Sequence, residues 1–167
     1  MNLYISMDKR ILAAAGVVVL LIIYAYFFIL NPSFVAKPNI PKPPLSSPQE
    51  IAVGHVNWLL NEVGAYKLHP SITSSEPPVI ESYVTDLDRR FTTTINNNYP
   101  TTTEGAAQNP DIRFVTDSWG FARLYAATDI IAEAKAMSSE KILTVEVLKD
   151  QAFLAEKGYL AIYDAIK

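Results

Sequence analysis

The chain has 167 residues, with 14 Lys or Arg, 17 Asp or Glu and no Cys, and charged residues make up only 19% of it. That share is below the roughly 25% of ordinary soluble domains, and the lack of cysteine excludes disulfides, thiol nucleophiles and thiolate metal sites. Residues 1–47 hold four of the basic residues and one of the acidic residues, so residues 48–167 are acidic. An acidic domain repels phosphate backbones, which argues against nucleic acid as a partner.

An uncharged apolar run occupies residues 11–30, after a charged N-terminal flank at residues 1–10. As a helix it would be about 30 Å long, the thickness of the hydrocarbon core of a bilayer. We therefore predict a single transmembrane helix with the lipid bilayer as its partner. A cleaved signal peptide is the alternative, but its apolar part would span only about 7–15 residues. Lys9 and Arg10 lie closer to the run than Lys37 and Lys42, which favours a domain outside the cytoplasm.

Residues 31–47 are rich in proline and predict a tether between the apolar run and the domain. Five prolines fall in this segment: Pro32, Pro38, Pro41, Pro43 and Pro44. Proline favours the extended polyproline II conformation, so the tether should be a semi-rigid spacer with a reach of about 50 Å. Ser47, Pro48 and Glu50 form a capping-box pattern, which places the start of a helical globular domain at residue 48.

The first half of the domain predicts one helix and three strands. Apolar residues recur at helical spacing over residues 48–66. The alternating segments 79–85 and 90–95 predict a hairpin, residues 96–110 a long loop, and residues 111–116 a third strand.

The second half is mostly helical. Residues 119–127 and 129–137 predict two short helices, with Thr128 capping the second one. A fourth strand follows at 141–147, and a last helix at 150–166 is interrupted by Gly158. Strands come first and helices mostly later, which predicts an α+β fold with a small, mostly antiparallel sheet covered on one face by helices.

Residues 109–167 carry a recognisable order of segments: NPDIRFVTDS, WGFARLYAA, TDIIAEAKAM, KILTVEV and DQAFLAEKGYLAIYDAI. This order resembles the C-terminal half of the sterol carrier protein type two family. The resemblance implies a sterol-carrier-like fold with a cavity between sheet and helices for an acyl chain or sterol. The family usually has five strands, a Gly where Ser139 and Glu140 stand here, and no membrane helix.

The resemblance also implies which side chains would line the cavity. The matching positions are Phe121, Leu124, Tyr125, Ile131, Phe153, Leu154 and Leu160. An aromatic and aliphatic set at helical spacing also fits an ordinary core, and that alternative remains open.

The sequence contains no constellation that indicates catalysis. His55 and His69 are far apart, and no metal-ligand spacing, nucleophile elbow or phosphate loop occurs. Asp86 and Asp88 straddle a turn next to Arg89 and Arg90, which would keep both carboxylates ionised. We therefore expect no catalytic residues, no metal and no cofactor.

These observations predict a membrane-anchored, non-enzymatic domain that binds a lipid, a sterol-like molecule or another apolar ligand. The alternative is an accessory or structural subunit of a membrane protein complex, which would contact partners through its helix and its acidic domain. Ala13, Ala14, Ala15 and Gly16 would offer that partner a surface of small residues.

Overall fold

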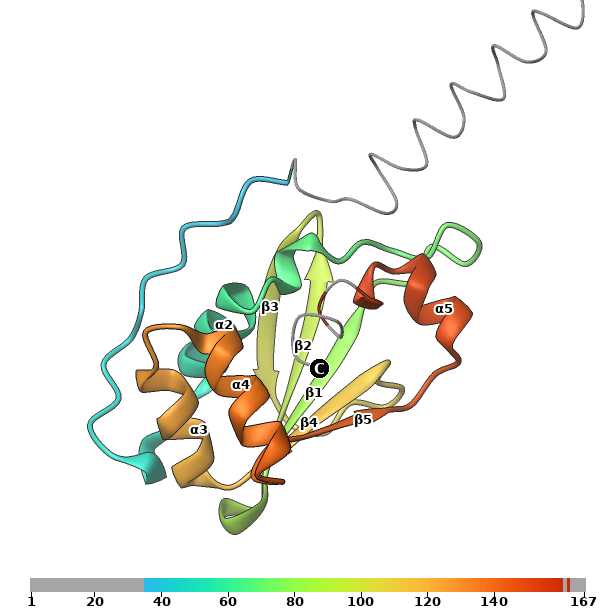
Figure 1. Cartoon of the computed structure of the whole chain (residues 1–167). Coiled ribbons are helices and arrows are strands. Elements are labelled where there is room, and N and C mark those ends of the chain that lie inside the picture. The colour runs from blue at the N-terminus through green and yellow to red at the C-terminus, as the bar shows by residue number, and fades with distance from the viewer. Residues whose placement is uncertain (1–34, 161, 163–167) are drawn as a thin grey trace, which may run out of the picture. The chain divides into compact units, whose positions relative to one another are not determined.

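The computed structural model describes residues 35–160 and residue 162, which belong to the compact unit Val35–Lys167 (Figure 1). The transmembrane helix predicted at residues 11–30, its flank at 1–10 and the first part of the tether lie outside the described residues. Within residues 35–160 and 162, no helix is both long enough and apolar enough to span a membrane.

In the described chain one helix precedes four strands, and two helices, a fifth strand and a last helix follow, which is an α+β order. The α-helices are α2 (Val53–Glu62), α3 (Ser118–Ala126), α4 (Ile130–Ser139) and α5 (Gln151–Glu156). The strands are β1 (Val79–Val84), β2 (Arg89–Asn96), β3 (Tyr99–Glu104), β4 (Ile112–Thr116) and β5 (Thr144–Val147). Three short 3-10 helices join them: η2 (Pro48–Glu50), η3 (Ala65–Lys67) and η4 (Thr85–Leu87).

The five strands form one mixed sheet in the order β3-β2-β1-β4-β5. The pairs β1–β2, β2–β3 and β4–β5 are antiparallel, whereas β1 and β4 run parallel. The prediction of an α+β fold is confirmed. The sheet is mixed, and three of its four strand pairs are antiparallel, as expected of a mostly antiparallel sheet.

The prediction of four strands and a loop over residues 96–110 is wrong, because β3 lies within that stretch. Asn97 and Asn98 both have positive φ, which is the geometry of a tight two-residue hairpin turn. The sequence of β3 shows no apolar alternation, because its inward side chains include a threonine. The hydroxyls of Thr93 and Thr102 lie 2.8 Å apart, and Thr102 donates to Asn57 of α2.

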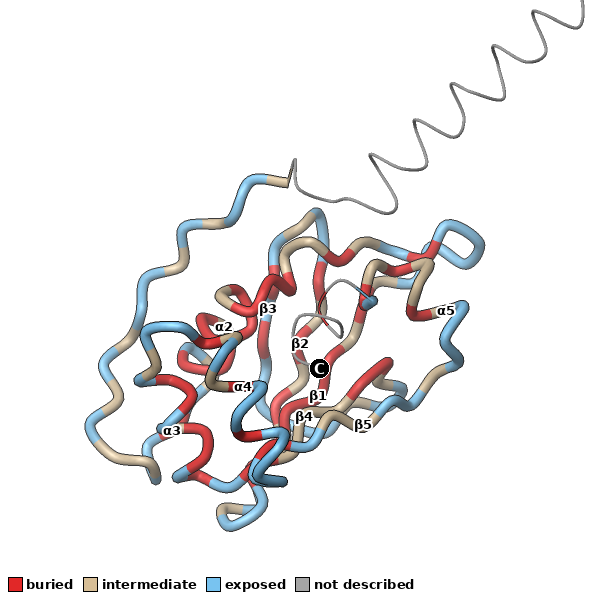
Figure 2. Tube along the Cα trace, in the orientation of Figure 1, coloured by how far each residue is buried: buried red, intermediate tan, exposed pale blue. Residues whose placement is uncertain are grey.

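One sheet face packs against the helices and carries most of the core. Ile80, Val84, Phe91, Ile95 and Ile112 alternate along the three middle strands and are at most 5% exposed. α2 contacts β2 and β3, and buried positions gather where the helices meet the sheet (Figure 2). This face positions the hollow described below.

The opposite face is polar and centres on Glu81, whose side chain is 1% exposed. Its carboxylate accepts bonds from Arg90 on β2, from Arg113 on β4 and from the backbone N–H of Ala107. Burial alone would raise the pKa of Glu81, but these donors outweigh burial and lower it. One carboxylate therefore joins three neighbouring strands.

The helix predicted at residues 48–66 is divided in the structure, so its predicted start at residue 48 is wrong. Ser47 does cap Gln49, but only for the single turn of η2. Ile51 then turns fully inward, Ala52 is extended, and α2 begins at Val53. The Nδ1 atom of His55 accepts the N–H of Ala52 and so plays the reciprocal part of a capping box.

The later elements lie near their predicted positions until the last helix, with two corrections. The predicted cap Thr128 is wrong, because Asp129 caps α4, and the last strand begins at Thr144 rather than at residue 141. Asp117, Asp129 and Asp150 each cap a helix by accepting a backbone N–H three residues on. α5 ends at Glu156, because Gly158 takes a left-handed φ of 86°. The predicted continuation from 163 to 166 lies outside the described residues.

Residues 35–47 run in an extended conformation along the domain, on the side of α2 and α3 (Figure 1). The prolines predict a spacer between the apolar run and the domain. In the structure this segment is instead held on the domain, because Asn61 and Tyr125 donate hydrogen bonds to the carbonyls of its prolines.

Candidate functional site

A cavity of about 390 Å³ lies between strands β4 and β5 of the sheet and the C-terminal helical segment. Its walls are formed mainly by apolar side chains of β4, β5, α5 and the residues that follow α5. The lining residues are Ile112, Phe114, Ser138, Lys141, Leu143, Thr144, Val145, Val147, Gln151, Leu154, Tyr159, Leu160 and Ile162.

The register of β4 and β5 places apolar side chains on the cavity side of the sheet. Phe114 pairs with Val145 and Ile112 pairs with Val147, so all four point to the same face of the sheet. α5 has only six residues, so it cannot cover this face completely. Val147 is accordingly 45% exposed and Leu160 is 44% exposed.

The polar lining residues lie at the surface rather than inside. Ser138, Lys141, Thr144 and Gln151 are all exposed, whereas Leu143, Leu154 and Ile162 are buried. The cavity therefore has an apolar interior and a polar rim, which is the arrangement that an apolar molecule with one polar end would fit.

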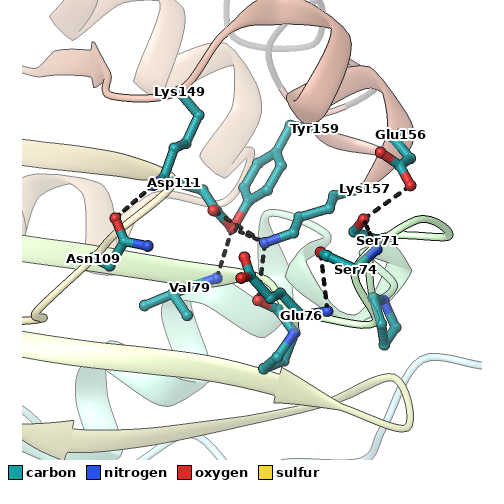
Figure 3. Close-up of polar contacts among 12 residues, drawn as sticks. Ser71, Ser74, Glu76, Val79, Asn109, Asp111, Lys149, Glu156, Lys157 and Tyr159 are labelled. Carbon is teal, nitrogen blue, oxygen red and sulfur yellow. Dashed lines mark hydrogen bonds and ion pairs between the residues drawn. The ribbon is translucent and has the colours of Figure 1, made fainter.

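A buried polar cluster holds the C-terminal wall of this cavity in place (Figure 3). The Nζ atom of Lys157 donates to both carboxylate oxygens of Asp111, at 3.1 and 3.0 Å, and to the carbonyl of Pro77. The hydroxyl of Tyr159 donates to Asp111 Oδ2 over 2.9 Å, and so does the N–H of Val79. Lys157, Asp111 and Tyr159 are each no more than 2% exposed.

The bonding pattern of this cluster favours a structural role. The ammonium of Lys157 already makes three hydrogen bonds, and the carboxylate of Asp111 is shared among Lys157, Tyr159 and Val79. Burial and the neighbouring carboxylate raise the pKa of Tyr159 well above its ordinary value of 10.0, so its hydroxyl stays protonated as a donor. The cluster thus ties the residues after α5 to the starts of β1 and β4.

A second tie lies beside it at the surface (Figure 3). Glu156 accepts the hydroxyl of Ser71 at 2.9 Å and the backbone N–H of Thr73 at 2.6 Å. These donors hold the pKa of Glu156 below its ordinary value. The wall is therefore anchored on both sides of the turn at Gly158.

The seven side chains expected to line a cavity fall into several places. Leu154 and Leu160 line the cavity. Phe121 and Leu124 border a separate void of only about 40 Å³ among α2, α3, α4 and the sheet. Tyr125 is covered by residues 42–44. Ile131 and Phe153 are half-buried and are not among the residues that line the cavity, and the ammonium of Lys157 lies 4.3 Å from the Phe153 ring centre.

The expectation from sequence omitted the strand side of the cavity. Ile112, Phe114, Val145 and Val147 lie within the predicted strands 111–116 and 141–147, and their alternation identifies one common face. That signal was in the sequence. No local pattern pairs Asp111 with Lys157, since they come together only in the folded chain.

Four other polar residues singled out in the sequence, His55, Asp86, Arg89 and Arg90, have structural partners. His55 accepts from Ala52 and contacts the carbonyl of Pro44. Asp86 accepts the backbone N–H of Ser118 and so caps α3 from outside the helix. Arg89 pairs with Glu104 and Arg90 with Glu81. Among residues 35–160 and 162, no three His, Asp or Glu side chains are grouped so as to hold a metal ion.

Comparison with known proteins gives structural neighbours only. No family model and no curated protein sequence matches the chain. A solved structure described as "UbiJ-SCP2 Ubiquinone synthesis protein" is similar to 87% of this chain and 96% of its own, with 10% identity and a TM-score of 0.39. The description of this neighbour includes SCP2, the abbreviation of the family that residues 109–167 resemble.

Two further neighbours are much larger proteins. The sec-alkylsulfatase Pisa1 from Pseudomonas sp. matches 60% of this chain with 14% of its own, at 12% identity and a TM-score of 0.37. A double mutant of the sec-alkyl sulfatase PisA1 matches 69% of this chain with 17% of its own, at 12% identity and a TM-score of 0.43. At such scores these similarities carry no conclusion about what the chain binds.

Proposed function

We propose that the domain binds an elongated apolar ligand, such as an acyl chain or a sterol-like molecule, in the cavity under β4 and β5. The observation that carries this proposal is the 390 Å³ hollow itself, with its apolar walls and exposed polar rim. Ligand pockets in proteins typically measure about 300–1,000 Å³, so the hollow has a suitable size.

The expected driving force is the removal of apolar surface from water. Each methylene that enters the cavity would contribute about 0.8 kcal/mol. No acidic side chain and no histidine lines the described walls, so the lining offers no obvious general base. We therefore propose binding without chemical conversion.

A pair of matched variants tests this function. Val145 lines the cavity, whereas Val115 on the neighbouring strand lies on the opposite sheet face, and both are half-buried. Val145→Phe should fill part of the cavity and weaken the binding of a dansyl-labelled fatty acid at least about tenfold, a loss of about 1.4 kcal/mol. Val115→Phe should bind the probe as the unmodified protein does.

Solvent extraction of the purified full chain followed by mass spectrometry is the complementary measurement. Co-purified lipid that is lost in Val145→Phe would support the proposal. Absence of probe binding in the unmodified protein, or equal losses in the two variants, would reject it.

We further propose that residues 11–30 anchor the domain in a bilayer, with the domain outside the cytoplasm. This proposal is supported by the uncharged length of the run and by the nearby Lys9 and Arg10. Washing membranes with alkaline carbonate tests the anchor, and protease treatment of intact cells tests the orientation. Release of the full chain into the wash would contradict the anchor.

A further inference from the structure

Residues 37–45, here called the strap, form a surface segment that covers a set of buried aromatic side chains. None of residues 35–50 is itself buried, and residues 35–46 have no regular secondary structure. The side chains beneath are buried nonetheless: Trp58 is 9% exposed, His55 7% and Tyr125 4%. The strap therefore lies on the domain as a bound peptide would.

Three hydrogen bonds between strap and domain share one pattern: the strap supplies proline carbonyls as acceptors, and the domain supplies side-chain donors. Asn61 donates to Pro38 at 3.1 Å, and Tyr125 donates to Pro43. The Nε2 atom of His55 lies 3.0 Å from the carbonyl of Pro44, and it carries the proton because Nδ1 accepts from Ala52. A proline-rich segment presents carbonyls but few N–H groups, so a donor-lined groove suits it.

The strap also places a cation against the aromatic side chains of the groove, which is formed by α2 and α3. The ammonium of Lys42 lies 4.3 Å from the ring centre of Trp58 and 4.7 Å from that of Tyr125. It also donates to the carbonyl of Tyr125 at 2.7 Å. Aromatic side chains with hydrogen-bond donors are a recurrent surface for extended proline-rich peptides, and the aromatic faces attract a cation.

The fit is incomplete, which favours an exchangeable segment over a permanent part of the core. The Oδ1 atom of Asn61 is buried without a hydrogen-bond partner among the described residues. A hollow of about 540 Å³ lies between residues 42–48 and the side chains of Ala122, Tyr125 and Ala126 of α3.

The strap does approach the domain closely at Gly54 of α2, where an added Cβ would lie 3.2 Å from Pro43. A larger side chain at this position would therefore collide with the strap.

We propose that α2 and α3 form a recognition groove for an extended, proline-rich segment with a central lysine, and that the chain's own strap occupies it reversibly in cis. Release would let residues 31–47 act as the predicted spacer, with a reach of about 50 Å. Occupancy of the groove thus controls the working length of the tether. This inference does not depend on the cavity or on its ligand.

Cleavage of the strap from the domain tests the proposal. The full chain, carrying an N-terminal tag and a protease site inserted between Ser46 and Ser47, is cut in detergent and held on resin by its tag. We expect the domain to stay bound, and an excess of free peptide covering residues 35–46 to elute it. A peptide with Lys42→Gln should elute it about tenfold less effectively. Asn39→Ala changes an exposed position of the strap, and this control peptide should act like the unmodified one.

A second measurement uses the uncut chain. In a Trp119→Phe background, Trp58 is the remaining tryptophan, and Gly54→Gln should displace the strap and raise the acrylamide quenching of Trp58 while far-UV circular dichroism stays unchanged. Three results would overturn the proposal. They are immediate loss of the domain after cutting, unfolding of the cut domain, and an intact chain that is a dimer with straps exchanged between copies.

Discussion

The same face of the sheet is filled at one end and hollow at the other. Where α2, α3 and α4 lie against β1 and β4, the remaining void measures about 40 Å³. Under β4, β5 and α5 the space is about 390 Å³. Phe114 and Leu143 border both, so these two side chains stand between the filled region and the hollow region.

The difference follows from the lengths of the covering elements. α2, α3 and α4 have nine or ten residues each, whereas α5 has six. Short elements present too few side chains to fill the space beneath them. Polar bonds around Asp111 hold the hollow region together where apolar packing holds the filled one. A cavity at the edge of a sheet can therefore persist without collapsing.

The sharpest test of this comparison is removal of the buried cation from the hollow region. Lys157→Met leaves the carboxylate of Asp111 buried without its cation, and we expect a loss of about 3–5 kcal/mol in the free energy of unfolding. Urea denaturation measures it. Lys149→Met is the control, because within the described part of the chain Lys149 bonds only the surface residue Asn109, and it should change stability by about 0.5 kcal/mol or less. Equal effects would show that the cluster does not hold the wall.

Truncation of one apolar side chain in each region should give opposite patterns. Phe121→Ala in the filled region should cost about 3–5 kcal/mol of stability and leave probe binding unchanged. Leu160→Ala in the hollow region should cost about 0.5 kcal/mol, because the side chain is 44% exposed, yet weaken binding of the dansyl-labelled fatty acid. Denaturation and probe titration of both variants give the comparison. A large stability loss in Leu160→Ala would mean that the hollow is closed in solution.

The two glycines Gly120 and Gly158 test packing against backbone geometry. A Cβ on Gly120 would lie 2.2 Å from Thr116 Oγ1 and 3.0 Å from Ile142, so Gly120→Ala should cost about 1–3 kcal/mol through overpacking. At Gly158 the nearest atoms are 3.6 Å away and only the positive φ is restrictive. Gly158→Asn should therefore cost less than about 1 kcal/mol, since asparagine tolerates the left-handed region. Thermal unfolding measures the stability loss of each variant. A larger loss for Gly158→Asn than for Gly120→Ala would contradict the prediction.

The smallest expected effect depends on pH. Tyr159→Phe should cost about 1 kcal/mol near neutral pH through its lost bond to Asp111. The pKa of Tyr159 is raised in the folded protein above 10.0, the ordinary tyrosine value that applies to the unfolded chain. Its contribution to the free energy of unfolding is therefore full below pH 10.0 and falls as the pH rises above that value. The gap between the variant and the unmodified protein should therefore narrow in urea melts at alkaline pH. Tyr99→Phe, at a position 50% exposed, should show no such trend. A constant gap would contradict the assignment.

Periodicity and caps predicted most of the helices and strands, because those signals are local. The aspartates that cap α3 and α5 and the alternation in β1, β2 and β4 are visible in short stretches of sequence, whereas the cap of α4 is Asp129 and not the predicted Thr128. β3 was not visible, since Thr101, Thr102 and Thr103 give no contrast between its two sides. The strap was expected as a free spacer, because composition reports the conformation of a segment and says nothing of what it lies against.

The candidate site was predictable only in part for a related reason. Helical spacing selected residues that face the core, but it could not tell where the core is filled and where it is hollow. Leu154 and Leu160 lie in the cavity, while Phe121 and Leu124 lie where longer helices close the space. Helix length and strand register, which only the folded chain brings together, decide between the two.

The strand order also has a kinetic consequence. Ile80 pairs with Thr93 on one side but with Ile112 on the other, more than twice as far along the chain. Closing the longer loop carries the greater entropy cost, and non-local pairing slows folding. We therefore expect the β1–β2–β3 meander to form early and β4 and β5 to join late. Amide hydrogen exchange should then be fastest in β5, which makes the cavity the part of the domain that forms last and opens first.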